Sequence, residues 1–317
     1  MAYRLLFIID PISGISPTTD TTFAFMLAAQ ARGHELNYCE VGDLYVDSGQ
    51  PMAHARHITL SSTAPHFGIG DHRLQPLASY HAIFMRKDPP VDLTYLYATQ
   101  ILSLLHPPLP LLINNPQALR DANEKLYALR FPTLTPPTLV SRDLGQLRRF
   151  LDILGGHMIV KPLDGCGGAG VLLLSSDDRN LNVLLELSTN NGTRLVLAQQ
   201  YIPEIRQGDK RILLLAGEPL GAILRVPRPN EHRGNLHVGA SCVPTTLTAR
   251  DSEIIETLAP HLVAAGLFFV GIDVIGAYLT EVNVTSPTGI QELSRFMDHD
   301  CSADVITRVE AAIAAQS

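Results

Sequence analysis

Residues 157–175 read HMIVKPLDGCGGAGVLLLS, and this stretch decides the fold. Its loop, GCGGAG at 165–170, has the G-x-G-x-x-G spacing of a dinucleotide-binding site. Such a site needs a helix after the loop, whereas the apolar run VLLL at 171–174 is typical of a strand. We therefore predict a glycine-rich loop between two strands, whose backbone N–H groups can bind phosphate. The alternative reading is an ordinary flexible turn. The G-x-x-x-x-G-K-[ST] motif of P-loop proteins is absent from the sequence.

A second stretch, FFVGIDVIGAYLTEVNV at 268–284, predicts two apolar strands joined at a Gly-Ala turn. Glu281 and Asn283 lie two residues apart and so share a strand face. A three-residue turn would set Asp273 opposite Glu281, whereas a two-residue turn would set it on the other face. Carboxylate and amide oxygens suit Mg²⁺ bridging nucleotide phosphates, so these three residues form a candidate metal site. The alternative is a solvated strand edge.

Basic residues elsewhere can neutralise the charge of a transferred phosphoryl group. Single lysines and arginines are more often solvated surface groups, but Lys161 and Arg211 border apolar strands. The full candidate set is Lys125, Lys161, Lys210, Arg211, Arg225 and Arg233. Residues 225–240 contain two prolines and two glycines and lack periodicity, which predicts either a disordered segment or an active-site lid.

The N-terminal part alternates between strand and helix patterns, which predicts a doubly wound α/β domain over residues 1 to about 120. Strands are expected at 3–9, 36–40, 82–85 and 111–113, and helices at 21–32 and 93–105. Residues 47–79 are expected to be irregular. Loops after the first and third strands are candidate ligand sites, because open α/β sheets bind ligands at the carboxyl ends of their strands.

The remainder of the chain has a different arrangement of expected helices and strands. One helix is expected to carry Lys125, and others are expected at 143–154, 248–265 and 302–315. Strands and turns are expected to dominate residues 171–243.

Composition narrows the class of protein. The chain has 317 residues, which suggests two or three domains. A net charge of -7 argues against nucleic acid or an anionic membrane surface as the main partner. No apolar run reaches about 18 residues, and the short apolar start reads as a buried strand rather than a signal peptide. The four cysteines form no Cys-x-x-Cys pair, so we expect reduced thiols and a cytoplasmic protein.

Seven collinear segments resemble prokaryotic glutathione synthetase. They are DPI at 10–12, MRKDPP at 85–90, LRDANEKL at 119–126, KPLDG at 161–165, GDKR at 208–211, RGNL at 233–236 and LTEVNVTSPT at 279–288. Residues 58–78 and 227–231 match poorly, and Cys166 stands where the family commonly has a bulkier Met. Because the segments span nearly the whole chain, the resemblance is far more specific than any one motif.

The resemblance implies an α/β fold in which an N-terminal doubly wound α/β domain is followed by an ATP-grasp domain pair. The N-terminal substrate domain would comprise residues 1–122 and the ATP-grasp domain residues 123–317, with subdomains at about 123–200 and 201–317. It also implies ATP-driven ligation of γ-glutamylcysteine to glycine through an acyl phosphate, in a homotetramer that uses Mg²⁺ or Mn²⁺.

The family's functional residues map onto this chain by position. ATP would contact Lys125, Lys161, Gly165, Gly167, Gly168, Gln199, Gln200, Tyr201, Ile202 and Asp209. The metal ion would contact Asp273, Glu281 and Asn283, and the catalytic residues would be Arg211 and Arg233. The two substrates would contact Ile12, Ser13, Arg86, Arg225, Ser286, Thr288 and Gly289.

Three rival functions stay open at this point. A related carboxylate–amine ligase acting on glutamate or D-alanine would use the same ATP site. The loop context disfavours a NAD-dependent oxidoreductase. A non-catalytic nucleotide-binding module would bind Mg-ATP without turnover. No Ser-His-Asp or Cys-His arrangement is evident, and ligation through an acyl phosphate needs no protein nucleophile.

Overall fold

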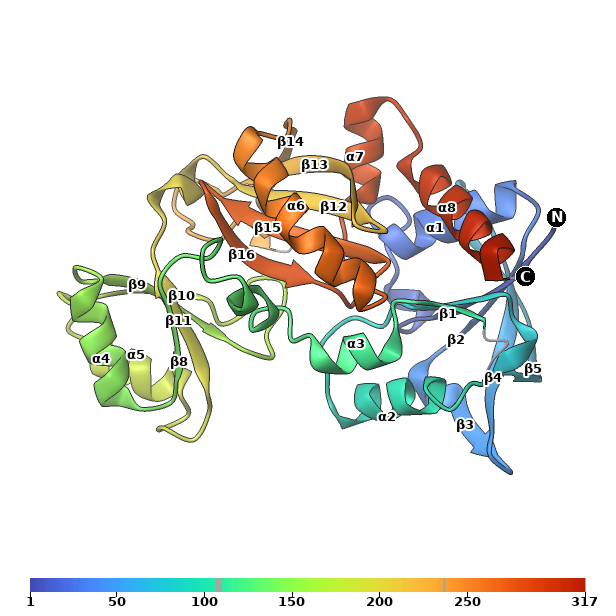
Figure 1. The fold of residues 1–317 in the computed structure, drawn as a ribbon, viewed down its shortest axis with the longest axis horizontal. Coiled ribbons are helices and arrows are strands. Elements are labelled where there is room, and N and C mark those ends of the chain that lie inside the picture. The colour runs from blue at the N-terminus through green and yellow to red at the C-terminus, as the bar shows by residue number, and fades with distance from the viewer. Residues whose placement is uncertain (107–109, 236–237, 317) are drawn as a thin grey trace.

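The computed structural model describes residues 1–106, 110–235 and 238–316, which form three β-sheets with α-helices packed against them (Figure 1). The N-terminal sheet has the strand order β3-β4-β2-β1-β6-β7, with β5 paired to β4. Its strands are β1 (Arg4–Ile8), β2 (Glu35–Cys39), β3 (Leu44–Asp47), β4 (Gln50–Leu60), β5 (Phe67–Pro76), β6 (Ala82–Met85) and β7 (Leu111–Ile113). Strands β2, β1, β6 and β7 are parallel, as the alternating strand and helix pattern predicted.

Helices cover both faces of this parallel core. Helix α1 (Thr21–Ala31) and the C-terminal helix α8 (Cys301–Gln316) lie on one face, and α2 (Leu93–Leu102) and α3 (Pro116–Asp121) lie on the other (Figure 1). Consecutive residues of β1 are buried against opposite layers, Phe7 with α1 and Leu6 with α2. Burial on both faces explains why β1 reads as a continuous apolar run.

The expectation that residues 47–79 are irregular was wrong. They contain the long antiparallel pair β4 and β5. Strand β4 does alternate between buried and exposed residues, but alanine fills two of its buried positions, Ala53 and Ala55. Alanine is depleted in strands, and nearly every residue of β5 is exposed, so neither strand gives a strong sequence signal.

The second sheet is antiparallel, with the order β10-β9-β11-β8. It comprises β8 (Thr138–Ser141), β9 (His157–Pro162), β10 (Leu172–Ser175) and β11 (Val196–Gln200), and it packs against α4 (Leu144–Ile153) and α5 (Leu181–Ser188). Helix α5 was missed because only Leu185 of its residues is fully buried.

The third sheet has the order β14-β13-β12-β15-β16 and is antiparallel throughout. Its strands are β12 (Asp209–Leu215), β13 (Glu218–Val226), β14 (Ser241–Pro244), β15 (Phe269–Ile275) and β16 (Tyr278–Asn283). Helix α6 (Ala249–Ala264) covers one face through Ile254, Leu258 and Leu262. The other face changes along β12 from charged residues to Leu213 and Leu215, which pack with α7 (Ile290–Met297) and α8.

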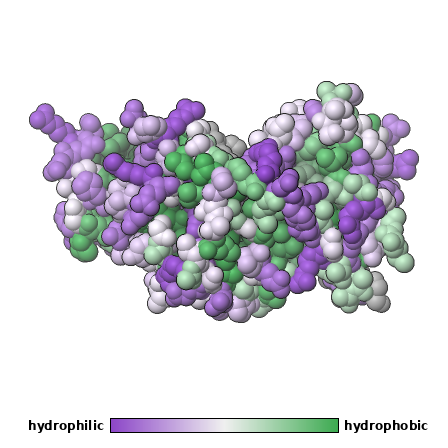
Figure 2. Space-filling model, turned by 90° about the horizontal axis from the view of Figure 1, so that it is seen from above, coloured by the Kyte–Doolittle hydropathy of each residue, from purple (hydrophilic) through white to green (hydrophobic). Residues whose placement is uncertain are grey.

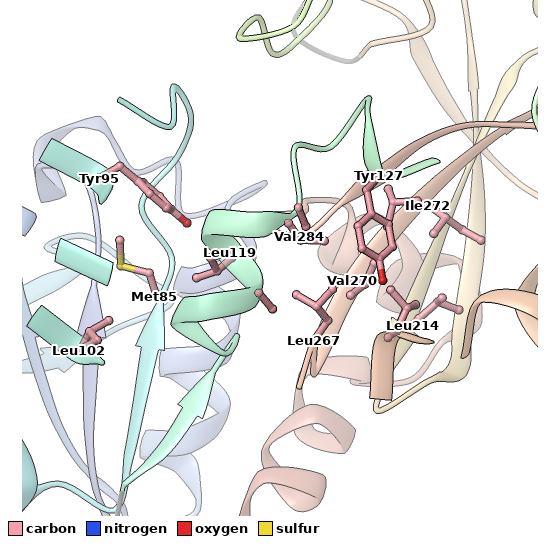
Figure 3. Close-up of a cluster of buried hydrophobic side chains, with 14 of the residues drawn as sticks. Met85, Tyr95, Leu102, Leu119, Tyr127, Leu214, Leu267, Val270, Ile272 and Val284 are labelled. Carbon is pink, nitrogen blue, oxygen red and sulfur yellow. The ribbon is translucent and has the colours of Figure 1, made fainter. Parts of the chain in front are cut away.

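One apolar cluster joins the first sheet to the third. Figure 3 shows Leu119 of α3 between Met85, Tyr95 and Leu102 on one side and Leu267, Val270 and Val284 on the other. The packing fixes the two sheets against each other, so loops from both can contribute to one site.

The helix expected to carry Lys125 ends earlier, at Asp121. The side chain of Asn123 accepts hydrogen bonds from the backbone N–H groups of Lys125 and Leu126, and this local turn competes with continuation of the helix. Short 3-10 helices complete the fold at Ile12–Gly14, Val41–Asp43, Leu77–Ser79, Tyr127–Arg130 and Pro203–Arg206.

Figure 2 shows polar residues along the full length of one face of the molecule, interleaved with smaller apolar areas. Within the ranges that the structure describes, none of the helices combines the length and the apolar character needed to cross a bilayer.

Candidate active site

A cleft of about 760 Å³, open to solvent, lies between the second and third sheets. Two sets of side chains face each other across it. The second sheet contributes Lys161 and the glycine-rich loop, the third sheet contributes carboxylates, and Lys125 comes from the turn after α3. The predicted residues that line the cleft are Lys125, Lys161, Gly165, Gly167, Gly168, Gln199, Gln200, Tyr201, Ile202, Asp209, Arg233, Asp273 and Glu281.

The glycine-rich loop joins β9 to β10, which pair antiparallel with Leu172 opposite Val160. No helix follows the loop, as predicted, so the dinucleotide reading does not apply. Gly168 has φ +82, and a Cβ there would lie 2.6 Å from Oδ1 of Asn235. Only glycine fits this combination of backbone conformation and close approach. Cys166 lines the cleft, and partial burial raises the pKa of its thiol.

The two lysines occupy different walls of the phosphate end of the cleft. Lys125 is buried, and its Nζ donates to the carbonyl of Gly165 at 2.5 Å and lies 3.8 Å from Oε1 of Glu281. Lys161 donates from Nζ to Oε1 of Gln199 at 3.3 Å. Both ammonium groups are therefore placed where they can meet phosphate oxygens.

The end of β11 and apolar side chains around it form the other end of the cleft. Gln199 is buried and donates from Nε2 to Oγ1 of Thr138 at 3.0 Å. Ile159, Ile205 and Ile275 line this end, and the sequence analysis did not identify them. Ile159 alternates along β9 with its buried neighbours Met158 and Val160, and this period of two could have indicated that Ile159 faces the cleft. No comparable pattern indicates Ile205 or Ile275.

Asp273 and Glu281 lie opposite each other on β15 and β16. The turn between these strands has two residues, which alone would have put the carboxylates on different faces. A bulge corrects this, because Thr280 is an extra residue between the pairs formed by Leu279 and Glu281. The Thr280 hydroxyl donates to the backbone carbonyl of Asp273 at 3.1 Å.

Behind the carboxylates lies a buried ion network. Arg211 donates to both carboxylate oxygens of Asp273, at 2.5 and 2.9 Å, and Arg225 lies 2.9 Å from Oδ2. Burial alone would raise the pKa of Asp273, but the two guanidinium groups outweigh it and lower the pKa.

Asp209 completes this network by pairing with Arg225 at 2.5 Å. Burial raises the pKa of Asp209, and Arg225 opposes the shift. Asp209 Oδ1 and Arg225 Nε are buried, and neither has a hydrogen-bond partner among the residues that the structure describes. The network therefore contains two polar atoms next to the cleft that can still form hydrogen bonds.

The donor set fits a hard divalent cation. Among the charged groups of the described residues, Glu281 contacts only Lys125, and Asn283, two residues along β16, uses its Nδ2 to donate to the carbonyl of Gly271. The side-chain oxygens of both residues can therefore accept a cation. Within residues 1–106, 110–235 and 238–316, no cluster of three or more His, Cys, Asp or Glu side chains is arranged to hold a metal ion. Asp273, Glu281 and Asn283 offer two carboxylates and an amide, and magnesium sites use one or two carboxylates plus substrate phosphates.

The described part of segment 225–240 crosses the cleft and contacts the glycine-rich loop. Arg233 donates from Nη1 to the carbonyl of Gly168 at 3.2 Å, and Nε2 of His232 lies 3.1 Å from the carbonyl of Val171. The carboxylate of Glu231 accepts hydrogen bonds from Nε and Nη2 of Arg233, at 2.9 and 2.6 Å. A Cβ on Gly234 would lie 2.6 Å from Cβ of Asp209, so this segment approaches the ion network closely.

The predicted substrate residues do not line this cleft, although Arg225 belongs to the ion network beside it. Arg86 is buried and donates to Oγ1 of Thr22 and to the carbonyl of Pro287, both at 3.0 Å. Arg211 donates to the carbonyl of Thr288 at 3.3 Å. Gly289 precedes α7, and Ser286 lies in the same loop. Arg86 and the loop 286–289 are thus brought together, while Ile12 and Ser13 lie in a 3-10 helix after β1.

Comparisons with known proteins agree with this geometry. The family model of the prokaryotic glutathione synthetase N-terminal domain matches residues 3–120, and that of its ATP-grasp domain matches residues 124–298. A glutathione synthetase of Synechococcus elongatus is 47% identical and aligns over 98% of this chain and 99% of its own length. The glutathione synthetase of Escherichia coli K12 is 42% identical, and the match covers 99% of each chain.

Solved structures show the same fold. The D-cycloserine synthetase DcsG superimposes with a TM-score of 0.69 over 99% of this chain and 100% of its own, at 16% identity. The ATP-grasp ligase PsnB, solved with a minimal precursor, Mg and ADP, gives a TM-score of 0.64 at 14% identity, over 98% of each chain.

Proposed function

Because this chain belongs to the prokaryotic glutathione synthetase family, it is an ATP-dependent ligase that makes glutathione, and we propose that the cleft between its second and third sheets binds ATP. One observation carries the proposal. Lys161 and a glycine-rich loop from one sheet, and Lys125 from the turn after α3, line the same cleft as a pair of opposed carboxylates from another sheet. This arrangement suits a nucleotide triphosphate with a divalent cation.

The enzyme uses ATP and a divalent metal ion. We propose Mg²⁺, with Mn²⁺ as a substitute, held by Asp273, Glu281 and Asn283, because hard oxygen donors suit both ions. When bound, the ion neutralises charge on the transferred phosphoryl group. Lys125 and Lys161 bind the phosphates, with the backbone of Gly165, Gly167 and Gly168. Gln199, Gln200, Tyr201 and Ile202 hold the adenine, and Asp209 adjoins the nucleotide.

The proposed reaction has two steps. The carboxylate of γ-glutamylcysteine attacks the γ-phosphoryl group, forming an acyl phosphate and releasing ADP. The glycine amine then attacks the acyl carbon, an amide bond forms, and phosphate leaves. No protein nucleophile is needed, so the chain must supply positioning, positive charge and exclusion of water. Arg211 stabilises the acyl phosphate, and Arg233 adds charge from the segment that crosses the cleft.

We propose further that Ile12, Ser13, Arg86 and Arg225 bind γ-glutamylcysteine, and that Ser286, Thr288 and Gly289 receive the glycine carboxylate. The hydrogen bond from Arg86 to Pro287 supports this, because it joins the two sets of residues. Residues 1–122 would act as the substrate domain, followed by subdomains 123–200 and 201–317. We expect a homotetramer in the cytoplasm, without nucleic-acid or membrane partners.

An omission assay tests the function. ADP and glutathione are measured with ATP, Mg²⁺, γ-glutamylcysteine and glycine, and each component is left out in turn. We expect both products only when all four are present. Equal turnover with glutamate or D-alanine in place of glycine would assign the chain to a different carboxylate–amine ligase.

A further inference from the structure

Residues 284–289 follow β16 and include the residues proposed to receive glycine, and we call this segment the acceptor loop. Side chains from other parts of the chain hold its backbone at several points. Glu124 accepts from Val284 N–H and Thr285 N–H, Asn114 donates to the Val284 carbonyl, Arg86 to the Pro287 carbonyl and Arg211 to the Thr288 carbonyl. Of these four side chains, those of Glu124 and Asn114 have no role in the site described above, and Glu124 forms more hydrogen bonds to the loop than Asn114 does.

Glu124 makes an unusual number of contacts to one short segment. Its Oε1 accepts from Val284 N at 3.0 Å, from Thr285 N at 3.2 Å and from Thr285 Oγ1 at 2.8 Å. Its backbone carbonyl also accepts from Val282 N at 2.9 Å, so residue 124 lies along the edge of β16. A carboxylate that receives several hydrogen bonds fixes the groups that donate them more tightly than a neutral acceptor does.

The residue next to Glu124 faces the ATP cleft. Lys125 donates to Gly165 in the glycine-rich loop and lies 3.8 Å from Glu281. Residues 124 and 125 therefore contact the acceptor loop on one side and the phosphate end of the cleft on the other. Their shared backbone joins the side chain that contacts the loop directly to the lysine that faces the phosphate end.

We propose that Glu124 is a positioning residue for the amine-attack step, because it fixes the acceptor loop relative to Lys125 and the phosphates. The inference rests on the proposed function, since it assigns that loop to glycine. Glu124 need not touch either substrate. Its effect is to hold the glycine amine at attacking distance from the acyl phosphate, where a misplacement of about 1 Å can cost about a hundredfold in rate.

The experiment compares Glu124→Ala with Glu124→Gln. The alanine variant loses the acceptor oxygen, and we expect its KM for glycine to rise about tenfold or more while its KM for ATP changes little. The ratio of glutathione formed to ADP formed should also fall, because a stranded acyl phosphate is hydrolysed. Glutamine keeps an oxygen at the same position, so Glu124→Gln should recover most of the coupling.

Glu310→Gln is the matched control. The carboxylate of Glu310 accepts a hydrogen bond from Nε of Arg32 and lies 2.9 Å from Nε2 of His34. These contacts lie where α8 packs on α1, remote from the acceptor loop. This variant should lower the unfolding temperature without changing the KM for glycine or the coupling ratio. If Glu124→Ala behaves the same way, Glu124 has only a structural role and the proposal is wrong.

Hydrogen exchange separates this inference from the proposed function. In Glu124→Ala the backbone amides of Val284 and Thr285 should exchange faster than in the parent protein. That result needs no turnover, so it stands even if the parent protein makes no glutathione. Unchanged protection of both amides would overturn the positioning role. Thr285→Val removes only the hydroxyl contact, and should give a smaller effect that is not additive with Glu124→Ala.

Discussion

Asp273 lies directly opposite Glu281 although the turn that joins their strands has only two residues. In a regular ladder from the pair Ile275 and Tyr278, Asp273 would face Thr280 and Glu281 would face Ile272. Glu281 would then point toward the buried cluster that contains Ile272. The single extra residue, Thr280, moves Glu281 to the cleft side of the sheet. A one-residue slip exchanges the two faces of a strand, so the carboxylate pair depends on this bulge.

Replacing Glu281 should abolish turnover more than it harms folding. Glu281→Gln removes one carboxylate of the pair, and we expect a loss of about a hundredfold or more at millimolar Mg²⁺, since even groups that only support metal ligands contribute about 10–100-fold. ADP release is measured against Mg²⁺ concentration, with circular dichroism to check the fold. Glu253→Gln, at an exposed glutamate on α6, is the control. Near-normal kcat in Glu281→Gln would contradict the metal role.

Lys161→Gln should weaken ATP binding without affecting glycine. Lys161 faces the cleft, and its Nζ donates a hydrogen bond to Gln199, so the substitution removes positive charge from the phosphate site. We expect the KM for ATP to rise about tenfold or more, because a hydrogen bond to a charged group is worth about 1.5–3 kcal/mol. Steady-state kinetics with each substrate varied in turn give the result. Arg148→Gln, at an exposed position on α4, should change neither KM.

Residues 227–240 should act as a lid over the active site. Residues 236 and 237 of this segment lie outside the described residues, but Arg233 already contacts the glycine-rich loop through Gly168. We expect trypsin to cut the free enzyme after Arg233, and Mg-ATP with γ-glutamylcysteine to slow the cut, because closure keeps water from the acyl phosphate. Arg233→Ala should raise KM and increase ATP hydrolysis uncoupled from glutathione formation. Equal cutting rates with and without ligands, and a fully coupled variant, would show a mobile surface loop instead.

Stability should decrease as the pH falls below about 6.5. Burial lowers the pKa of His34 from its ordinary value of 6.5, with Arg32 adding to the shift and Glu310 opposing it. The unfolded chain therefore binds a proton at this position before the folded protein does, so the free energy of unfolding falls as pH falls through this range. Urea unfolding at several pH values between 7.5 and 5.5 measures the slope.

His34→Gln removes this titrating group, and its stability should depend less on pH over the same range. The carboxylate of Glu310 contributes at lower pH, because its pKa is lowered, first by its hydrogen bond with Arg32. Its stabilisation is present above about 4.5 and is lost only as pH falls through the lowered value. Identical slopes for the parent protein and His34→Gln would rule out His34 as the cause.

Local patterns determined most of the elements and the main parts of the cleft. The parallel strands, the glycine-rich loop between two strands and the apolar hairpin at 268–284 follow from apolar runs and glycine positions, because burial on both faces demands continuous apolar sequence. The strands β4 and β5 did not show in the sequence, since alanine and exposed side chains carry no clear period.

Which charged groups lie in contact depends on how distant segments pack together. The sequence placed Arg211, Arg225 and Asp273 near strands, but their buried network depends on the register of three neighbouring strands. The turn length alone pointed to the wrong face for Glu281, and the bulge at Thr280 reversed it. The hydrogen bond between Glu124 and Thr285 joins residues that are 161 positions apart in the sequence. Register, bulges and long-range hydrogen bonds are set by packing between segments distant in the chain, and short-range sequence patterns contain no record of that packing.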